Sequence, residues 1–410
     1  MKLPRGLRAF AHPDFRIWYA TQIVALVAGW MQSVAQSWLV LQLTDSPIRL
    51  GFIGTLQFGP VLLFSVVSGA LADRLPKRGI LVGTQTAYVV YALVTAALVA
   101  TGAIQYWHVC VIAVAGGLTN ALDMPTRQAF YVDMVGKDDV TNAVALSSAA
   151  FNAARIVGPA LGGLLIARVG VAPAFLVNAL ATTLVVITLL RLRAAGRPQE
   201  RPAATVRSEV AEGLRYARRT PLIMLLLGLL FVVSLCVFNF TVYIPLLARH
   251  VLGLGPEWFG YLMAALGVGA VAGALTVGTW PGRPPLVAMF ATAALACTGL
   301  LGLGLVRDVG AAVPLLLGTG FTGLFLVASC NTGLQLAAPD ELRGRIMSLY
   351  TLVFGGMFPI GAFLVGAISE RWGVSRALYA GGVFGLSSLV VLFAWWARRS
   401  HRRPLGEAVA

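Results

Sequence analysis

Two ionisable side chains stand inside long apolar runs of the sequence: Asp123, near the end of the run 106–124, and Arg155, in the middle of the run 143–167. A charge at the centre of a bilayer costs at least about 2.5–3.5 kcal/mol on insertion scales, so such residues face the protein interior or a water-filled cavity. Arg155 therefore either binds an anionic substrate or a proton-carrying carboxylate, or forms a structural pair with Asp123 or helix carbonyl groups. Asp123, and Glu257 at the start of another run, are candidates for gates or for proton carriers.

The run that holds Arg155 also contains Gly158, Pro159, Gly162 and Gly163. Proline within a helix removes a backbone donor and bends the helix. Glycines remove side chains and allow another helix to approach closely. The spacing predicts a bent, closely packed helix with a conformational role, against the alternative of ordinary glycine-rich packing.

The sequence does not support metal binding, direct use of ATP or enzymatic catalysis. The histidines fall near the ends of apolar runs or in tails; they are His12, His108, His250 and His401. The cysteines lie inside the runs without the spacing of metal ligands; they are Cys110, Cys236, Cys297 and Cys330. No phosphate-binding GxxxxGK[ST] loop occurs, so ATP is not the direct energy source. We expect no metal, no cofactor and no enzymatic activity, which would need clustered histidines and carboxylates within the runs.

The elements that position these residues are membrane helices. The chain has 410 residues, of which 58% are hydrophobic and only 11% charged, and its mean hydropathy is +0.82. Soluble domains carry about 25% charged residues, and a bilayer span needs about 20 mostly apolar residues. The sequence predicts an all-α polytopic membrane protein with twelve spans, at 16–42, 47–72, 79–101, 106–124, 143–167, 172–192, 221–248, 257–279, 285–306, 311–334, 346–368 and 374–397.

The distribution of lysine and arginine predicts the orientation. With the N-terminus inside, 24 of the 31 basic residues fall in cytoplasmic segments and six fall outside, and Arg155 remains in mid-membrane. Cytoplasmic loops carry such an excess, so both termini are expected in the cytoplasm. The net charge of +15 then reflects topology beside anionic lipid rather than nucleic-acid binding, because the charges do not share one face.

The chain divides at its middle. Residues 193–220 contain no spanning run, and Val206, Val210, Leu214 and Ala217 recur there at helical spacing, which predicts an amphipathic helix on the cytoplasmic membrane surface. We therefore expect six-helix bundles at 1–192 and 221–410. Glycines at 163 and 170 recur at 366 and 373, an offset of 203, which indicates a parallel repeat of the two halves.

These features resemble the major facilitator superfamily. Residues 69–78, with Gly69, Asp73, Arg74 and Arg78, are similar to its cytoplasmic-loop motif GxLaDrxGrk, although Pro76 replaces the usual glycine. The matching loop of the second half, Thr279–Arg283, has lost the acidic residue. Residues 158–163 resemble the motif that the superfamily associates with antiporting exporters.

A narrower resemblance is to the bacterial branch that includes the enterobactin exporter and macrolide-efflux proteins. It rests on the segments Trp38–Gln42, Pro125–Phe130, Asn152–Pro159 and Pro339–Ser348. The resemblance implies a monomeric inner-membrane exporter of a small molecule, driven by protons and working by alternating access. An uncoupled facilitator or lipid translocator of the same fold is the alternative.

The resemblance also implies site residues. Asp73, Arg74 and Arg78, with Asp123, are expected to form a cytoplasmic gate that latches the halves. The first, fourth, seventh and tenth spans line the centre of this fold, and each of their polar residues is either a substrate contact or a helix-packing group. Together with Asn152 and Arg155 of the fifth span, the candidates for the cavity are Gln22, Trp30, Gln36, Asn120, Asn239, Tyr243, Asn331 and Gln335.

Overall fold

The computed structural model describes residues 4–194 and 206–400, except for the side chains of 5, 65–74, 206–211 and 400. The helices of the first half are η1 (Arg5–Ala11), α1 (Pro13–Thr44), α2 (Pro47–Arg74), α3 (Lys77–Ala100), α4 (Tyr106–Val169) and α5 (Ala172–Arg191). The helix α6 (Val206–Arg219) precedes α7 (Pro221–Cys236), α8 (Phe240–Leu246), the π-helix η2 (Leu247–Val251), α9 (Pro256–Gly278), α10 (Leu286–Leu305), α11 (Val309–Ala337), α12 (Asp340–Trp372) and α13 (Val374–Ser400).

Eleven helical segments of the described chain are long and apolar enough to cross a membrane. The number agrees with twelve spans because α4 carries two of them. Gly136 lies within α4 at φ 74° and ψ 175°, a conformation that glycine adopts without steric cost, and it divides the helix into a first arm before it and a second arm after it. The sequence ended the fourth span at residue 124. The helix itself continues beyond that position, through polar residues, as far as Val135.

The predicted span 221–248 is not one continuous helix. α7 ends at Cys236, α8 begins after Asn239, and the chain continues into η2. Together they make one membrane segment, Pro221–Val251. Apolar composition locates such a segment but carries no information about the break within it, because hydropathy does not distinguish helical from irregular backbone.

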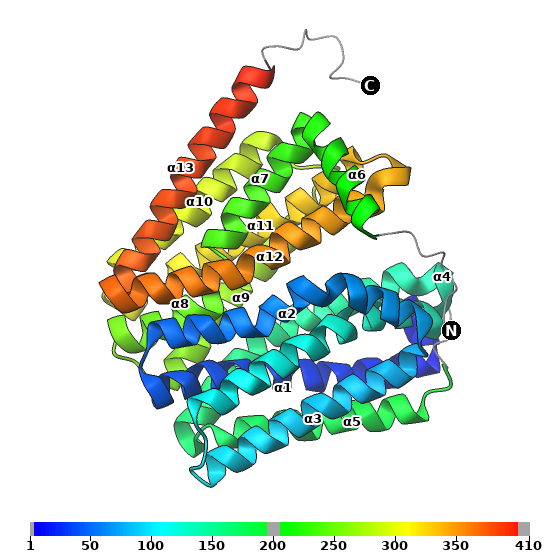
Figure 1. Cartoon of the computed structure of the whole chain (residues 1–410), viewed down its shortest axis with the longest axis vertical. Helices are drawn as coiled ribbons and strands as arrows, with labels where there is room; N and C mark the ends of the chain where they lie inside the picture. The colour runs from blue at the N-terminus through cyan, green and yellow to red at the C-terminus, as the bar shows by residue number, and fades with distance from the viewer. Residues whose placement is uncertain (1–3, 195–205, 401–410) are drawn as a thin grey trace.

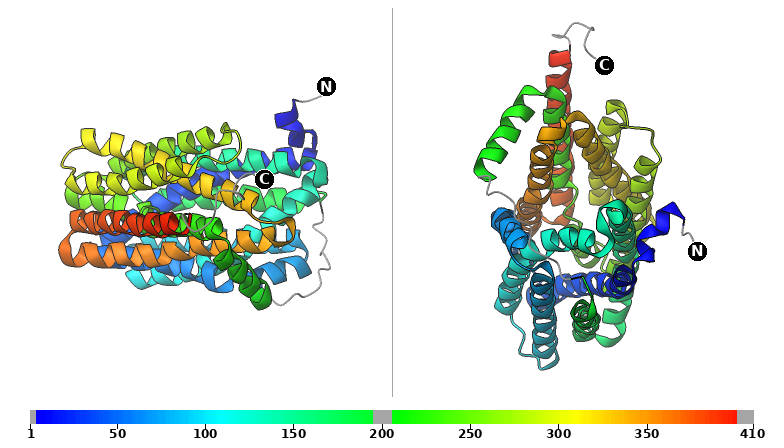
Figure 2. Two further views of the ribbon diagram at one scale, coloured as in Figure 1. Left: turned by 90° about the horizontal axis from the view of Figure 1, so that it is seen from above. Right: turned by 90° about the vertical axis from the view of Figure 1, so that its right-hand side faces the viewer.

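The helices form two groups, which Figure 1 shows one above the other. α1 to α5 pack among themselves, as do α7 to α13. Two helix pairs make most of the contact between the groups: α2 with α12, and the second arm of α4 with α9. We call these the α2–α12 seam and the α4–α9 seam. Smaller contacts join α8 to α1 and α2, and α9 to α1. The helices of both groups run along a shared direction in the left view of Figure 2.

The helix α6 packs at the edge of the second group. A Cβ on Gly213 would lie 3.2 Å from the Cβ of Arg345, and Arg345 forms an ion pair of 2.5 Å with Glu212. The sequence predicted a helix here that lies on the membrane surface. In the structure, the part of α6 with described side chains packs against α12, because Gly213 lets the α12 backbone approach.

Candidate functional site

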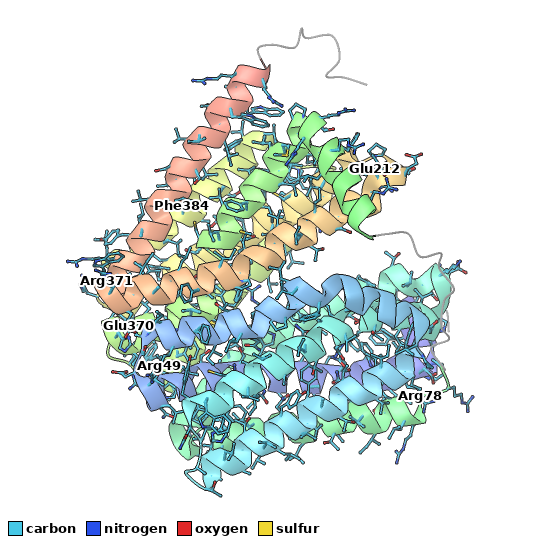
Figure 3. The ribbon with its side chains drawn as sticks, in the orientation of Figure 1. Arg49, Arg78, Glu212, Glu370, Arg371 and Phe384 are labelled. Atoms are coloured by element: carbon cyan, nitrogen blue, oxygen red, sulfur yellow. The ribbon has the colours of Figure 1, made fainter. Side chains whose placement is uncertain are left out.

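The two groups meet closely at one end of the molecule, which we call the closed end. Asp45, one of the two residues between α1 and α2, forms ion pairs with Arg249 at 2.8 Å and His250 at 3.2 Å. Glu370 of α12 accepts hydrogen bonds from the Ser46 hydroxyl at 2.8 Å and the Ile48 amide at 3.2 Å. Glu370 and Arg49 mark this end in Figure 3, opposite to Arg78. Sequence reasoning missed these contacts, since their partners stand about 200 and 320 residues apart in the chain and no local pattern links them.

Electrostatics support the pairing at the closed end. The hydrogen bond from His250, and then the positive charge of Arg249, lower the pKa of the Asp45 carboxyl below its usual value. The Asp45 side chain is 63% exposed, so water screens its ion pairs. These contacts therefore stabilise the closed end only weakly, so they do not prevent it from opening.

The two helices of the α4–α9 seam approach each other closely because glycines lie at their contact. A Cβ on Gly163 would lie 3.0 Å from the Cα of Gly260, and a Cβ on Gly260 would meet the carbonyl of Pro159. Gly158 and Gly162 instead face α1, where a Cβ would lie 2.7 Å from the Val27 carbonyl or 2.9 Å from the Met31 Cα. The motif was expected to shape the helix against the second half. In the structure this applies to Gly163 and Pro159, because residues 158 and 162 lie one turn apart on a different face, which meets α1.

The α2–α12 seam repeats this arrangement. A Cβ on Gly51 would lie 3.1 Å from the Cα of Gly366, and the Thr55 hydroxyl donates to the carbonyl of Pro359 at 2.8 Å. Further from the closed end, the rings of Phe58 and Phe358 lie 4.4 Å apart between centroids. The two seams therefore join the groups through closely packed backbones.

Arg155 lies in the α4–α9 seam. The residue is 8% exposed, and its guanidinium carbon stands 4.7 Å from the ring centroid of Phe240 in the other group, a cation–π contact. Asn152, one turn away, is partly buried and donates to the carbonyl of Ser148 at 2.9 Å. The structure does not pair Arg155 with Asp123.

Asp123 has its own partners inside the first group. It is 4% exposed and accepts hydrogen bonds from Thr84 and Gln85, both at 2.7 Å. Arg127, one turn further along α4, donates to its other oxygen at 3.0 Å and 2.5 Å. This closed network links α3 to α4, because each carboxylate oxygen has charged or polar donors.

The structure describes the side chains of only some of the residues that were expected to form the cytoplasmic gate. The side chains of Asp73 and Arg74 lie outside the described residues. Arg78 donates to the carbonyl of Leu190 on α5, so it is not a partner of Asp123 as the sequence analysis expected. A neighbouring pair that the analysis missed is Lys77 with Asp133, at 2.9 Å, which joins the start of α3 to the first arm of α4.

The polar residues expected to line the centre do not converge on one site. Gln36 and Gln57 interact at 3.4 Å, Gln335 donates to Asn331 at 2.5 Å, and Trp30 packs edge-on against Phe151 at 5.8 Å. Gln22 is buried and Asn120 partly buried, each on its own helix.

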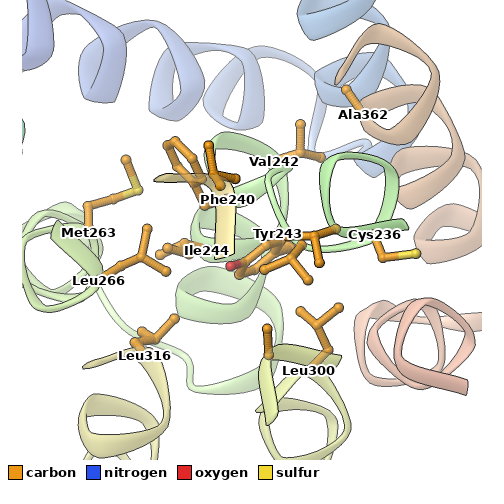
Figure 4. Close-up of a cluster of buried hydrophobic side chains, with 14 of the residues drawn as sticks. Cys236, Phe240, Val242, Tyr243, Ile244, Met263, Leu266, Leu300, Leu316 and Ala362 are labelled. Carbon is orange, nitrogen blue, oxygen red and sulfur yellow. The ribbon is translucent and has the colours of Figure 1, made fainter. Parts of the chain in front are cut away.

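Tyr243 and Asn239 were also expected to line the cavity. Both are fully buried. Tyr243 lies in an apolar cluster with Ile244 and Leu266, which Figure 4 shows. Asn239 donates to the carbonyl of Leu235 at the break between α7 and α8. A straight helix through the span would not predict the break beside Asn239.

Comparison with known proteins identifies the family. The sequence profile described as "Transmembrane secretion effector" matches residues 5–402. The chain is 22% identical to the staphyloferrin A transporter of Staphylococcus aureus, with 93% of this chain and 95% of that protein covered. It is 28% identical to the enterobactin exporter EntS of Escherichia coli, covering 93% and 91%. The multidrug efflux pump Tap of Mycolicibacterium fortuitum is 27% identical, covering 85% and 87%.

Solved structures show the same fold at low sequence identity. A bacterial homologue of the human lysosomal transporter Spinster, in an inward-facing and unoccupied conformation, aligns with a TM-score of 0.75 at 13% identity, over 99% of this chain and 100% of that chain. The nucleoside transporter NupG aligns with a TM-score of 0.72 at 11% identity, over 93% and 98%. The chain therefore belongs to the transmembrane secretion effector family of the major facilitator superfamily, and it is a multi-pass membrane transporter rather than an enzyme.

Proposed function

We propose that this transporter exports a small amphiphilic molecule, of the drug or siderophore type, across the bacterial cytoplasmic membrane in exchange for protons. The mechanism is alternating access, in which the halves 1–192 and 221–410 rock about the two seams. The names of the efflux pump Tap and the exporter EntS support the direction of transport. These two relatives and the staphyloferrin A transporter support the class of molecule.

One observation carries the mechanism. The second arm of α4 carries a strip of residues along one side of the helix: Ser148, Asn152, Pro159 and Gly163. Pro159 and Gly163 contact α9 of the other group. Burial along this strip rises from exposed Ser148, through partly buried Asn152, to buried Pro159. The groups thus touch near the closed end and diverge away from it, as expected for one state of a rocking transporter.

The basic residues give the proposed orientation. Arg78, α6 and the break of α4 lie away from the closed end, among segments that the positive-inside rule assigns to the cytoplasm (Figures 1 and 3). The closed end then faces outward, both termini lie inside, and the described state is open to the cytoplasm, where the cargo enters. Asp73 and Arg74, with Arg78, are proposed to latch the cytoplasmic side when the protein turns outward.

The experiment is uptake into inside-out membrane vesicles from cells that express the protein, with a panel of labelled amphiphiles. We expect accumulation of at least one compound that needs an imposed pH gradient and collapses with a protonophore. The matched control is vesicles that carry Gly163→Leu, which keeps every charged residue. If no compound is transported by vesicles containing well-folded protein, the proposed function is wrong.

A second candidate is an uncoupled facilitator or lipid translocator of the same fold. The observation that favours it is the network around Asp123, where Arg127 already neutralises the carboxylate, so that protonation there loses an ion pair. Transport that proceeds equally with and without a pH gradient supports this candidate.

A further inference from the structure

Arg155 occupies the position on the second arm of α4 that Phe358 occupies on α12. The offset of 203 that relates Gly163 to Gly366 and Gly170 to Gly373 also relates 155 to 358. The structure supports this register, because Gly170 and Gly373 end their helices at φ 88° and 89°. The two side chains are therefore equivalent by the internal repeat.

At these equivalent positions the seams differ in chemistry. Phe358 closes the α2–α12 seam by packing on Phe58, with centroids 4.4 Å apart. Arg155, whose backbone lies in the α4–α9 seam, instead covers Phe240 of α8 at 4.7 Å. An aromatic side chain at this position is thus enough to fill the space in the α2–α12 seam. The need to fill space therefore does not explain why the equivalent position in the α4–α9 seam carries a cation.

The charge of Arg155 has no anionic partner among the described residues. Phe240 contacts the guanidinium, and the carboxylate that the sequence analysis offered as its partner, Asp123, is held by Arg127, Thr84 and Gln85. Only 8% of the Arg155 residue is exposed. A buried cation is costly unless an anion compensates it, and a contact with a ring face uses only the face of the guanidinium. The N–H groups at its edge form a planar fork suited to a carboxylate or phosphate.

Arg155 also lies where the two groups part. Towards the closed end, Pro159 and Gly163 touch α9, and next to Arg155 a Cβ on Gly267 would lie 3.2 Å from the Arg155 carbonyl. In the other direction, Asn152 is partly exposed and Ser148 is exposed. A molecule that enters between the groups therefore meets Arg155 at the innermost point of the opening.

We propose that Arg155 binds an anionic group, such as a carboxylate, phosphate or phenolate, on the transported molecule. This inference rests on the proposed function and deepens it, because it assigns the cargo to the class of amphiphilic anions. The cation supplies charge-assisted hydrogen bonds to the anionic group, while the apolar body of the molecule lies against neighbouring apolar side chains of the seam.

The test measures binding and needs neither transport nor a pH gradient. Purified protein in nanodiscs of zwitterionic lipid is titrated with 4-butylbenzoate and with 4-butylbenzamide, which differ in charge but hardly in shape, and empty nanodiscs give the blank. Because hydrogen bonds to charged groups contribute more than neutral ones, we expect the benzoate to bind about tenfold more tightly. Equal binding of the two probes, or binding of neither, overturns the inference.

Two variants assign the preference to residue 155. Arg155→Phe installs the side chain that the repeat uses at position 358, so the fold and the seam are expected to survive while the preference for the benzoate disappears. Arg155→Lys keeps the charge without the planar fork and should keep only part of the preference. The control Arg168→Gln removes an exposed arginine at the closed end and should change nothing. A preference that persists in a folded Arg155→Phe protein overturns the assignment.

A competition experiment shows which kind of anion Arg155 binds: the transported molecule, a free ion or a lipid headgroup. Inorganic phosphate, or phosphatidylglycerol in the nanodisc, at a concentration equal to that of the benzoate should leave benzoate binding within about twofold, since neither fills an amphiphilic site. Full displacement by either one shows that Arg155 holds a free ion or a lipid headgroup, and the assignment to the cargo is then wrong. These readouts stay valid if the vesicle experiment finds no proton coupling, so the two proposals fail separately.

Discussion

Gly163 of α4 and Gly260 of α9 pack backbone against backbone across the boundary between the two groups, so that a Cβ on Gly163 would lie 3.0 Å from the Cα of Gly260. Gly162, its neighbour in sequence, instead meets Met31 of its own group at 2.9 Å. Two adjacent glycines of one motif thus serve different purposes: one allows the groups to meet, and the other allows one group to fold.

This difference gives a paired prediction. Gly163→Leu should prevent the closed end from forming, because helices separated by side chains lie about 8–10 Å apart. Gly162→Leu should instead lower thermal stability, since it forces α1 away within one group. Spin labels at the exposed positions 168 and 371, on different groups, should show a longer distance in Gly163→Leu that no longer responds to acid.

Gly116 provides the control, because a Cβ there would meet nothing within 4 Å. Gly116→Ala should leave both the distance and the melting temperature unchanged. A Gly163→Leu protein whose label distance still changes with pH as in the wild type would show that this contact is incidental.

Asp45 should act as a structural contact rather than as the proton sensor. Its pKa is lowered by His250 and Arg249, so its stabilising contribution is present above the ordinary value of about 3.9 and is lost only as pH falls through the lowered pKa. Asp45 therefore stays ionised between pH 7 and pH 5, and we expect its titration to make no contribution to any change of the label distance in that range.

Asp45→Asn should weaken the closed end at every pH in that range. Exposed ion pairs contribute about 0.2–1 kcal/mol, which corresponds to a change of up to about fivefold in the population of the closed end. The label-distance distribution measures this population. If the effect of Asp45→Asn appears at pH 7 and vanishes at pH 5, the carboxylate titrates in that range and the prediction is wrong.

Removal of one member of the buried network should cost more than removal of two. Asp123→Ala leaves the Arg127 charge without its partner, and breaking buried pairs in this way costs about 3–5 kcal/mol in soluble proteins. The double variant Asp123→Leu with Arg127→Met should melt at a higher temperature than the single variant, because no charge is left unpaired. Thermal unfolding in detergent compares them, and equal melting temperatures would argue against the network.

Asp73→Asn should impair transport while membrane insertion stays normal. The expectation rests on the resemblance of residues 69–78 to the cytoplasmic-loop motif, in which the carboxylate stabilises the outward-facing state. Initial rates in the vesicle assay, normalised to the amount of monodisperse protein, give the measurement. Wild-type rates from a well-expressed variant would exclude a latch at this residue.

The sequence predicted what depends on local composition. Apolar runs located the spans, and the glycines at 163, 170, 366 and 373 revealed the repeat that the positive φ values of Gly170 and Gly373 support. Arg155 was also recognised as a buried cation, because a charge within an apolar run is visible without coordinates.

What the sequence did not predict depends on rotation and distance. The packing of α1 determines which neighbour Gly162 meets, and the break at Asn239 interrupts a span that reads as one apolar run. The contacts of Asp45 with Arg249 and of Glu370 with Ser46 join residues far apart in the chain. Apolar periodicity is weak in a membrane helix, since lipid and protein interior are both apolar, so it does not specify which face meets which neighbour.

The close backbone contacts at the seams have an evolutionary consequence. Gly51, Gly163, Gly260 and Gly366 each meet backbone atoms of the opposite helix, so no substitution on the partner creates room for a larger residue. Gly228, by contrast, meets the side chain of Leu392, which a smaller residue replaces easily. Among descendants of a common ancestor, the first four positions should resist change independently of one another, whereas Gly228 and Leu392 should drift together.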